Sequence, residues 1–221
     1  MNTAALIFDM DGTMIDSMPF HARSWSEFTR RHGIDMPVGE VLRRTTGRTG
    51  VECMRELFGP QLAEVKARGL VGEKETIYRD LFAPVFAEVR GFARFARLAM
   101  LRGLKVAVGT AGDQHNIDFV LTRLQMNPPP DAVVGGDQGL PGKPEPAIFL
   151  EAARRVGVDA GQCIVFEDAP LGIEAARRAG MRAVAICSTH TGAELAGAHV
   201  LAQVRDYEEL MTTKFLESLD A

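Results

Sequence analysis

The chain begins with a short apolar segment that runs directly into two acidic residues. Residues 4–8 read AALIF and are followed by DMDGT at residues 9–13. An apolar run bounded by a turn signal predicts a buried strand, and open α/β sheets carry their chemistry beyond the carboxyl ends of their strands. Asp9 and Asp11 would crowd negative charge there, which is unfavourable unless a cation or a reaction uses them. The alternative is a strand that ends in a turn with two solvated carboxylates.

Short apolar segments alternate with helical periodicity after residue 90. This alternation predicts an α/β fold, a right-handed Rossmann-like parallel sheet with helices on both faces, and the first strand belongs to that sheet. The expected strands are residues 104–109, 132–134, 163–166 and 181–186, and the expected helices are residues 92–102, 116–124, 146–156 and 171–179.

Between the first strand and this alternation lies a stretch with helical periodicity and few strand signals. Glycines and prolines divide it into several short helices, and Phe20, Trp25 and Phe28 could share one helical face. The 221 residues allow a core plus a smaller insertion. We therefore expect an all-helical cap at residues 16–89, inserted into a core made of residues 1–15 and 90–221.

Charge and composition exclude several classes of protein. The net charge of −4 argues against a nucleic-acid partner. The three cysteines are far apart, without a C-x-x-C pair, which favours a reducing compartment over a disulfide framework or a zinc site. The N-terminus lacks the features of a signal peptide, and no apolar run approaches the ~20 residues of a membrane span. We expect a cytoplasmic protein without a membrane partner, and both monomer and dimer remain open.

Three later strand ends carry groups that suit a phosphate and a metal ion. Thr110 has small neighbours that let backbone N–H groups approach a phosphate closely. Lys143 lies in the segment GKPEP, which its prolines stiffen. Glu167 and Asp168 form a second acidic pair at the end of an apolar strand. Taken singly, each has a plainer explanation: a capped turn, a solvated lysine, or acids at a helix N-terminus.

The four strand ends together are more specific than any one of them. Asp9, Asp11, Glu167 and Asp168 can converge at one sheet edge, and hard oxygen ligands select Mg²⁺ rather than zinc. Lys143 would add positive charge. Two unit charges ~4 Å apart interact by about 4 kcal/mol at an effective dielectric constant of 20. Without such cations, repulsion between Asp9 and a phosphate dianion would oppose any reaction between them.

In order along the chain, DMDGT at residues 9–13, Thr110, Lys143 and the Glu167-Asp168 pair match the four motifs of the haloacid dehalogenase-like hydrolases. The chain most resembles the subgroup with a helical cap after the first strand, which includes β-phosphoglucomutase and small phosphatases. The resemblance covers essentially the whole chain, and the stretch FEDAPLGIEAA at residues 166–176 is highly specific. It implies an enzyme, a phosphoric monoester hydrolase.

The resemblance also implies a role for each motif residue. Asp9 would be the nucleophile that forms an aspartyl phosphate, and Asp11 would be the general acid for the leaving group and then the general base for water. Covalent catalysis of this kind splits one difficult displacement into two easier ones. The implied Mg²⁺ ligands are Asp9, Asp11 through its backbone carbonyl, Asp168, and Glu167 directly or through water. The implied phosphoryl-binding groups are Thr110, Lys143 and the backbone amides of Met10 and Ala111.

Two other reactions of such enzymes fit less well. A halide leaving group needs no protonation, so dehalogenation would give Asp11 no task as an acid. Phosphonate cleavage of the related type requires a cap lysine for a Schiff base, and the two cap lysines, Lys66 and Lys74, lie near no motif. We therefore expect hydrolysis of a small phosphorylated metabolite such as a sugar phosphate.

A phosphosugar mutase is the first alternative. His21 matches a cap-hinge histidine of β-phosphoglucomutase, although it is also explained as a hinge residue bound to a backbone carbonyl. Thr46 and Gly50 stand where the mutase cap carries a lysine and an arginine, and Arg44 or Arg48 would substitute only in part. His21, Thr46 and Arg48 are thus the candidate substrate-binding residues of the cap. A non-catalytic regulatory or binding protein on the same fold is the alternative of another class.

Overall fold

The structure, a computed structural model, describes residues 3–45 and 48–219. In that part of the chain six parallel strands form one sheet in the order β3-β2-β1-β4-β5-β6. The α/β prediction is confirmed, and the sheet has one strand more than expected. The strands are β1 Ala5–Phe8, β2 Lys105–Gly109, β3 Ala132–Val134, β4 Cys163–Glu167, β5 Arg182–Ile186 and β6 Val200–Val204.

The first strand, β1, lies between β2 and β4, and its register fixes the position of the acidic residues. Phe8 is level with Val108 of β2 and with Phe166 of β4. All four residues of β1 are buried, as expected for a parallel strand covered on both faces. The residues that follow β1, β2 and β4 therefore meet at one edge. The strand order reverses at this point, because β2 and β3 lie on one side of β1, and β4, β5 and β6 lie on the other. Ligand sites of open α/β sheets lie at such a point.

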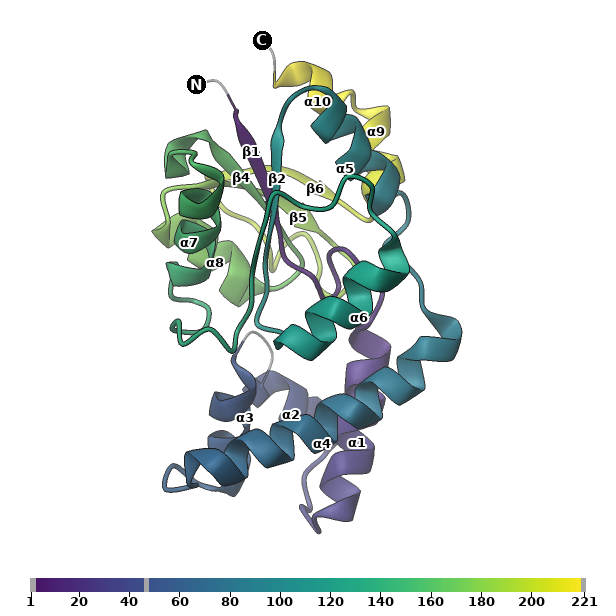
Figure 1. Cartoon of the computed structure of the whole chain (residues 1–221), viewed down its shortest axis with the longest axis vertical. Coiled ribbons are helices and arrows are strands. Elements are labelled where there is room, and N and C mark those ends of the chain that lie inside the picture. The colour runs from purple at the N-terminus through teal and green to yellow at the C-terminus, as the bar shows by residue number, and fades with distance from the viewer. Residues whose placement is uncertain (1–2, 46–47, 220–221) are drawn as a thin grey trace.

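Helices cover both faces of the sheet (Figure 1). Aromatic residues dominate one face, where Phe8 stacks on Phe166 with ring centroids 4.5 Å apart. That face is covered by α5 Phe92–Leu101, α6 Gln114–Leu124, α9 Tyr207–Thr212 and α10 Phe215–Ser218. The other face is covered by α7 Ala147–Val156 and α8 Pro170–Arg178, with the short 3₁₀ turn Ala160–Gln162 before β4. The elements after residue 186, namely β6, α9 and α10, were not expected from the sequence.

A helical insert follows β1 and lies beyond the carboxyl edge of the sheet (Figure 1). It has its own hydrophobic cluster around Trp25 and Phe28. Phe20 does not join that cluster, contrary to expectation, and instead stacks on Phe82 at 4.9 Å and packs against the core. The insert consists of α1 Met18–Arg31, α2 Val38–Thr45, α3 Gly50–Phe58, α4 Glu64–Phe82 and the 3₁₀ turn Ala83–Val85.

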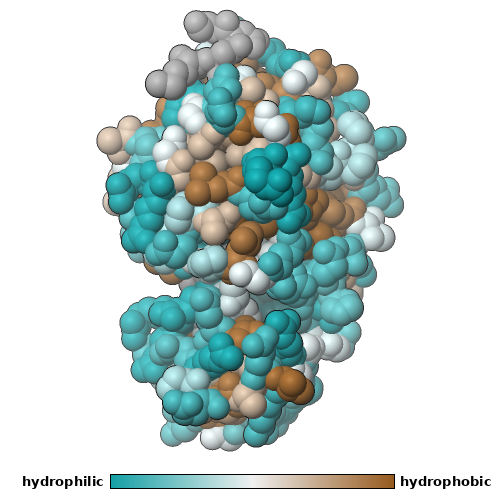
Figure 2. All heavy atoms as spheres, turned by 60° about the vertical axis from the view of Figure 1, so that its left-hand side comes forward, coloured by the Kyte–Doolittle hydropathy of each residue, from teal (hydrophilic) through white to brown (hydrophobic). Residues whose placement is uncertain are grey.

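Two chain segments join the insert to the sheet domain. The surface of the molecule narrows where the insert meets the sheet domain (Figure 2). Ile15 of the first segment forms a β-bridge with Glu88 of the second, so the two connections support each other. Among the described residues, none of the helices has both the length and the apolar character that crossing a membrane requires.

Candidate active site

A buried lysine joins two of the predicted acidic residues at the carboxyl edge of the sheet. Nζ of Lys143 lies 2.5 Å from Oδ1 of Asp9 and 2.5 Å from Oε1 of Glu167. All three side chains are buried. The other oxygen of Glu167 accepts a hydrogen bond of 2.8 Å from the backbone N–H of Ala169. Both oxygens of Glu167 thus have partners, and this carboxylate holds Lys143 in place together with Asp9.

Asp168 is held by hydroxyl groups. Its Oδ1 accepts a hydrogen bond of 3.3 Å from Thr13, and its Oδ2 accepts a short one from Thr189 in the loop after β5. Gly12 packs directly against it: a Cβ at residue 12 would lie 2.2 Å from Oδ2 of Asp168. Gly12 also has a φ of +76°, which residues with side chains rarely adopt. The glycine of the DMDGT motif therefore lets this carboxylate approach the turn after β1.

The buried charges of this edge do not balance. When fully ionised, the three buried carboxylates Asp9, Glu167 and Asp168 outweigh the single ammonium of Lys143 and give a net charge of −2. Burial raises the pKa of Asp9 to about 7, and although Lys143 opposes this, the charges of Glu167 and Asp11 add to it. Burial and the charges of Glu167 and Asp9 raise the pKa of Asp168 as well. A bound divalent cation would cancel this excess of negative charge.

The donor set also suits a divalent cation that retains water. In the described part of the chain, no three His, Cys, Asp or Glu side chains group as a metal site. Mg²⁺ does not require such a cage, because it keeps several waters and takes one or two carboxylates together with a substrate phosphate. Asp9 and Asp168 can supply the two carboxylates. The residues present therefore fit magnesium better than a metal held by protein side chains alone.

The side chain of Asp11 contacts residues of the insert and its hinge rather than Lys143. Its Oδ1 accepts hydrogen bonds from Ser17 at 2.7 Å, His21 at 3.0 Å and Tyr78 at 3.3 Å. Burial alone would raise the pKa of Asp11, but the contacts with His21, Ser17 and then Lys74 lower it to about 2. The two aspartates of one motif therefore have opposite electrostatic environments.

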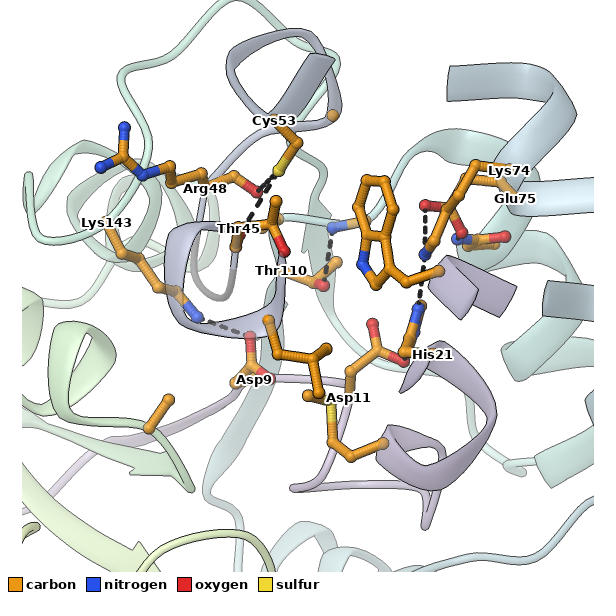
Figure 3. A pocket seen from close by; sticks show the side chains of 18 of the residues that line it. Asp9, Asp11, His21, Thr45, Arg48, Cys53, Lys74, Glu75, Thr110 and Lys143 are labelled. Carbon is orange, nitrogen blue, oxygen red and sulfur yellow. Dashed lines mark hydrogen bonds and ion pairs between the residues drawn. The ribbon is translucent and has the colours of Figure 1, made fainter. Parts of the chain in front are cut away.

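Lys74 lies in the same cavity, so the sequence interpretation that placed it near no motif was wrong. It is 2% exposed, and its Nζ lies 2.7 Å from Nδ1 of His21 and 2.9 Å from Oε1 of Glu75 (Figure 3). Helix α4 carries it beside α1 and thus to the end of β1. Because its ammonium is held between a carboxylate and an imidazole, Lys74 is not presented as the free amine that a Schiff base requires.

Thr110 and two backbone amides lie at the same edge of the sheet as Asp9. Thr110 is buried, and its Oγ1 accepts a hydrogen bond of 3.0 Å from the N–H of Gly112. The N–H groups of Met10 and Ala111 have no acceptor within the described residues. Buried polar groups of folded proteins are nearly always paired. These two donors are therefore available to a ligand.

The site opens into a cavity of about 130 Å³ between the insert and the sheet domain. Its wall includes Arg48, which is half-exposed and lies 3.9 Å from Glu56. In Figure 3 the side chains of Thr45, Arg48 and Cys53 lie across the cavity from Asp9 and Asp11. Thr46, the third cap residue expected to bind substrate, lies outside the described residues. His21 and Arg48 do line the cavity.

Several residues of the site were not singled out from the sequence. They are Ser17, Glu75, Tyr78, Asn116 and Thr189. Tyr78 follows Lys74 by one helical turn, and this spacing is the signal that could have placed both on one face of α4. The other four carry no comparable local signal.

Comparisons with known proteins agree with this geometry. A model of the haloacid dehalogenase-like hydrolase family matches residues 3–180. The chain is 33% identical over 182 residues to the fructose-1-phosphate phosphatase YqaB of Escherichia coli, covering 82% of this chain and 95% of that protein. It is 34% identical over 197 residues to the validoxylamine A 7'-phosphate phosphatase of Streptomyces hygroscopicus subsp. limoneus, covering 88% and 91%.

A solved structure shares the complete architecture. The β-phosphoglucomutase of Clostridium difficile superposes with a TM-score of 0.84 at 23% identity, over 99% of this chain and 97% of that one. At this identity the likeness concerns the fold, a parallel sheet with a helical insert after its first strand.

Proposed function

Because the chain belongs to the haloacid dehalogenase-like hydrolases and is an enzyme of that family, we propose that it is a Mg²⁺-dependent phosphatase. Its substrate is a small phosphorylated metabolite, a sugar phosphate or a close relative, and the reaction passes through an aspartyl phosphate. The observation that carries this proposal is the position of Asp9, whose carboxylate lies 2.5 Å from Lys143 at the sheet edge. The free amides of Met10 and Ala111 lie at the same edge.

Asp9 and Asp168 would hold the magnesium ion through their carboxylates and Asp11 through its backbone carbonyl. Both oxygens of Glu167 already accept hydrogen bonds, so Glu167 would contact the magnesium ion only through a water molecule. When bound, Mg²⁺ would offset the charge of the phosphate and of Asp9. This assignment rests on the net charge of −2 among the buried groups and on the oxygen donors present.

In the first step an oxygen of Asp9 bonds to phosphorus while the bond from phosphorus to the ester oxygen breaks. Asp11 gives its proton to that leaving oxygen. The low pKa of Asp11 makes the carboxylate its resting form, and a phosphate dianion bound beside it raises its affinity for a proton. Lys143, Thr110 and the two amides hold the phosphoryl oxygens, and such fixed donors stabilise charge that develops during transfer.

In the second step Asp11 takes a proton from water, and the water oxygen attacks phosphorus. The bond between phosphorus and Asp9 breaks, which releases inorganic phosphate and restores the carboxylate. An unprotonated Asp11 is the form that this step needs, in agreement with its lowered pKa.

We place the cap at residues 16–89 and the catalytic core at residues 1–15 and 90–221. Closure of such a cap excludes bulk water and supplies contacts to the leaving group. The names of the two relatives, a fructose-1-phosphate phosphatase and a validoxylamine phosphate phosphatase, support a carbohydrate-like leaving group. Cys53, Cys163 and Cys187 are all free thiols, which suits a cytoplasmic enzyme.

The experiment is a screen of phosphorylated metabolites with Mg²⁺, in which released phosphate is measured and the Asp9→Asn variant serves as the control. We expect turnover of one or more sugar or polyol phosphates that EDTA abolishes. Conversion of β-glucose 1-phosphate to the 6-phosphate faster than phosphate release would instead identify a mutase. Absence of turnover, with p-nitrophenyl phosphate included, would favour a regulatory or binding protein.

A further inference from the structure

Glu75 is an acidic side chain in the cavity wall that the phosphoryl-transfer steps do not use. It belongs to α4 of the cap, and its side chain is 14% exposed. Its Oε1 accepts from Nζ of Lys74 at 2.9 Å, and its Oε2 accepts from Nδ2 of Asn116 at 2.8 Å. Asn116 lies in the first turn of α6 in the sheet domain. Glu75 thus stands where the cap meets the core.

The orientation of Asn116 is fixed by a second contact. Arg79 of α4 donates to Oδ1 of Asn116 at 2.8 Å, so the amide oxygen faces Arg79 and the NH₂ group faces Glu75. Although burial would raise the pKa of Glu75, the charge of Lys74 and the hydrogen bonds from Asn116 and Lys74 hold it below its usual range. Glu75 is therefore a carboxylate, and carboxylates have about four acceptor positions. Its two hydrogen bonds leave room for more in the cavity.

The cations of the cavity are already engaged. Lys143 is bound to Asp9 and Glu167, and Lys74 is bound to Glu75 and His21. Among the described residues that line the cavity, Arg48 is the remaining cation, and it is half-exposed beside Glu56. A second phosphate group on the substrate would find this one guanidinium and would also meet the negative charge of Glu75.

The rest of the wall around the leaving group is mostly apolar. Its members come from α1, α2, α3 and α4, and they are Met18, Trp25, Leu42, Met54 and Val71. The carbon–hydrogen face of a sugar or polyol can pack on such a wall, while its hydroxyl groups require acceptors. Glu75 provides these acceptors at the cap–core boundary.

We propose that Glu75 determines the substrate specificity of this site. It accepts hydrogen bonds from the hydroxyl groups of a neutral polyol leaving group, and its charge rejects substrates that carry a second phosphate. The inference rests on the proposed function, since it takes the phosphoryl group to be at Asp9. It adds to that function a class of substrate, the monophosphate esters of neutral polyols.

The test compares kcat/KM for three substrates. Fructose 1-phosphate and fructose 1,6-bisphosphate differ by one phosphate, and p-nitrophenyl phosphate lacks hydroxyl groups. Glu75→Gln removes the charge but keeps the shape of the side chain. Glu73→Gln is the matched control, because Glu73 lies on the same helix but binds His32 at 2.9 Å, away from the cavity wall.

In Glu75→Gln we expect the preference for fructose 1-phosphate over the bisphosphate to fall about tenfold, because a like charge near the second phosphate is removed. We expect no such change in Glu73→Gln. Glu75→Asp keeps the negative charge, so this variant should still prefer the monophosphate to the bisphosphate. Its shorter side chain withdraws the acceptor oxygens from the substrate hydroxyl groups, so the preference for fructose 1-phosphate over p-nitrophenyl phosphate should fall. This variant also carries the test if Glu75→Gln does not fold.

Ratios in Glu75→Gln within about twofold of wild type, a difference of about 0.4 kcal/mol, would overturn the proposal, as would a wild-type enzyme that prefers the bisphosphate. Such results leave the phosphatase activity itself intact. A wild-type enzyme that hydrolyses none of the three substrates with Mg²⁺ overturns the proposed function and this inference together.

Discussion

Nζ of Lys74 lies 2.7 Å from Nδ1 of His21, and this contact determines which nitrogen of the imidazole carries the proton. A lysine ammonium has donors and no acceptor, so Nδ1 must accept. The proton therefore lies on Nε2, which donates to Oδ1 of Asp11 at 3.0 Å. A buried cap lysine thus orients the carboxylate to which we assign proton transfer.

Lys74→Met should impair the reactions that need a proton donor more than those that do not. We expect kcat for a sugar phosphate to fall by about 10²-fold, in the range of general acid–base contributions. The fall should be smaller for p-nitrophenyl phosphate, because p-nitrophenolate leaves without protonation. Steady-state kinetics with both substrates measures this. Lys66→Met, an exposed change on the same helix, is the control. Equal losses for the two substrates would contradict the role given to Lys74.

Lys143→Met should destabilise the protein as well as inactivate it. The substitution leaves Asp9 and Glu167 buried without their cation, and breaking a buried pair in this way costs about 3–5 kcal/mol. Urea unfolding of the metal-free protein at neutral pH measures the loss. Since the carboxylates can take up protons, the deficit should shrink as the pH falls. A variant as stable as wild type at neutral pH would refute the electrostatic account of this edge.

Stabilisation by Mg²⁺ should increase with pH. The pKa of Asp9 is raised from an ordinary 3.8 to about 7, so between these values the native state binds a proton that the unfolded state has lost. The free energy of unfolding of the metal-free protein therefore falls as the pH rises through this window. A metal ion competes with that proton. The increase of Tm on adding Mg²⁺ should thus be larger at pH about 8 than at about 5, and Asp168→Asn should abolish it. A shift independent of pH would argue against Asp9 as a ligand.

Gly12→Ala should disturb the metal site directly. Its Cβ would lie 2.2 Å from Oδ2 of Asp168, so the carboxylate or the turn must move. Gly33→Ala is the matched control, because Gly33 also has a positive φ, +64°, but nothing lies within 4 Å of its Cβ. Both changes introduce backbone strain of about 1–2 kcal/mol. Only Gly12→Ala is expected to bind Mg²⁺ more weakly, and calorimetry measures this affinity. Equal Mg²⁺ affinities in the two variants would show that Asp168 does not depend on this glycine.

The core of the site could be predicted because its residues lie at the ends of strands. Asp9, Thr110 and Glu167 each follow or end a short apolar run, and parallel strands bring such ends to one edge. The helical insert was equally visible in the change of periodicity after residue 17. Local patterns decide these features, so no knowledge of the packing was needed.

The contacts between domains could not be predicted in this way. Lys74 and Glu75 reach the cavity because α4 packs beside α1, and Asn116 meets them across the boundary. No local pattern reports such a juxtaposition. The strand β6 was missed for another reason: it lies at the edge of the sheet, and most of its side chains are exposed or only partly buried, so its apolar pattern is weak.

The central claim, that Asp9 attacks phosphorus, is tested most directly by trapping the phosphorylated enzyme. A substrate labelled in its phosphoryl group is mixed with excess enzyme and Mg²⁺, quenched in acid within one turnover, and the labelled peptide is mapped. We expect an acyl phosphate, labile to hydroxylamine, on Asp9 and none in Asp9→Asn. Release of labelled phosphate with no label on the protein at any quench time, or a label retained in Asp9→Asn, would contradict the account.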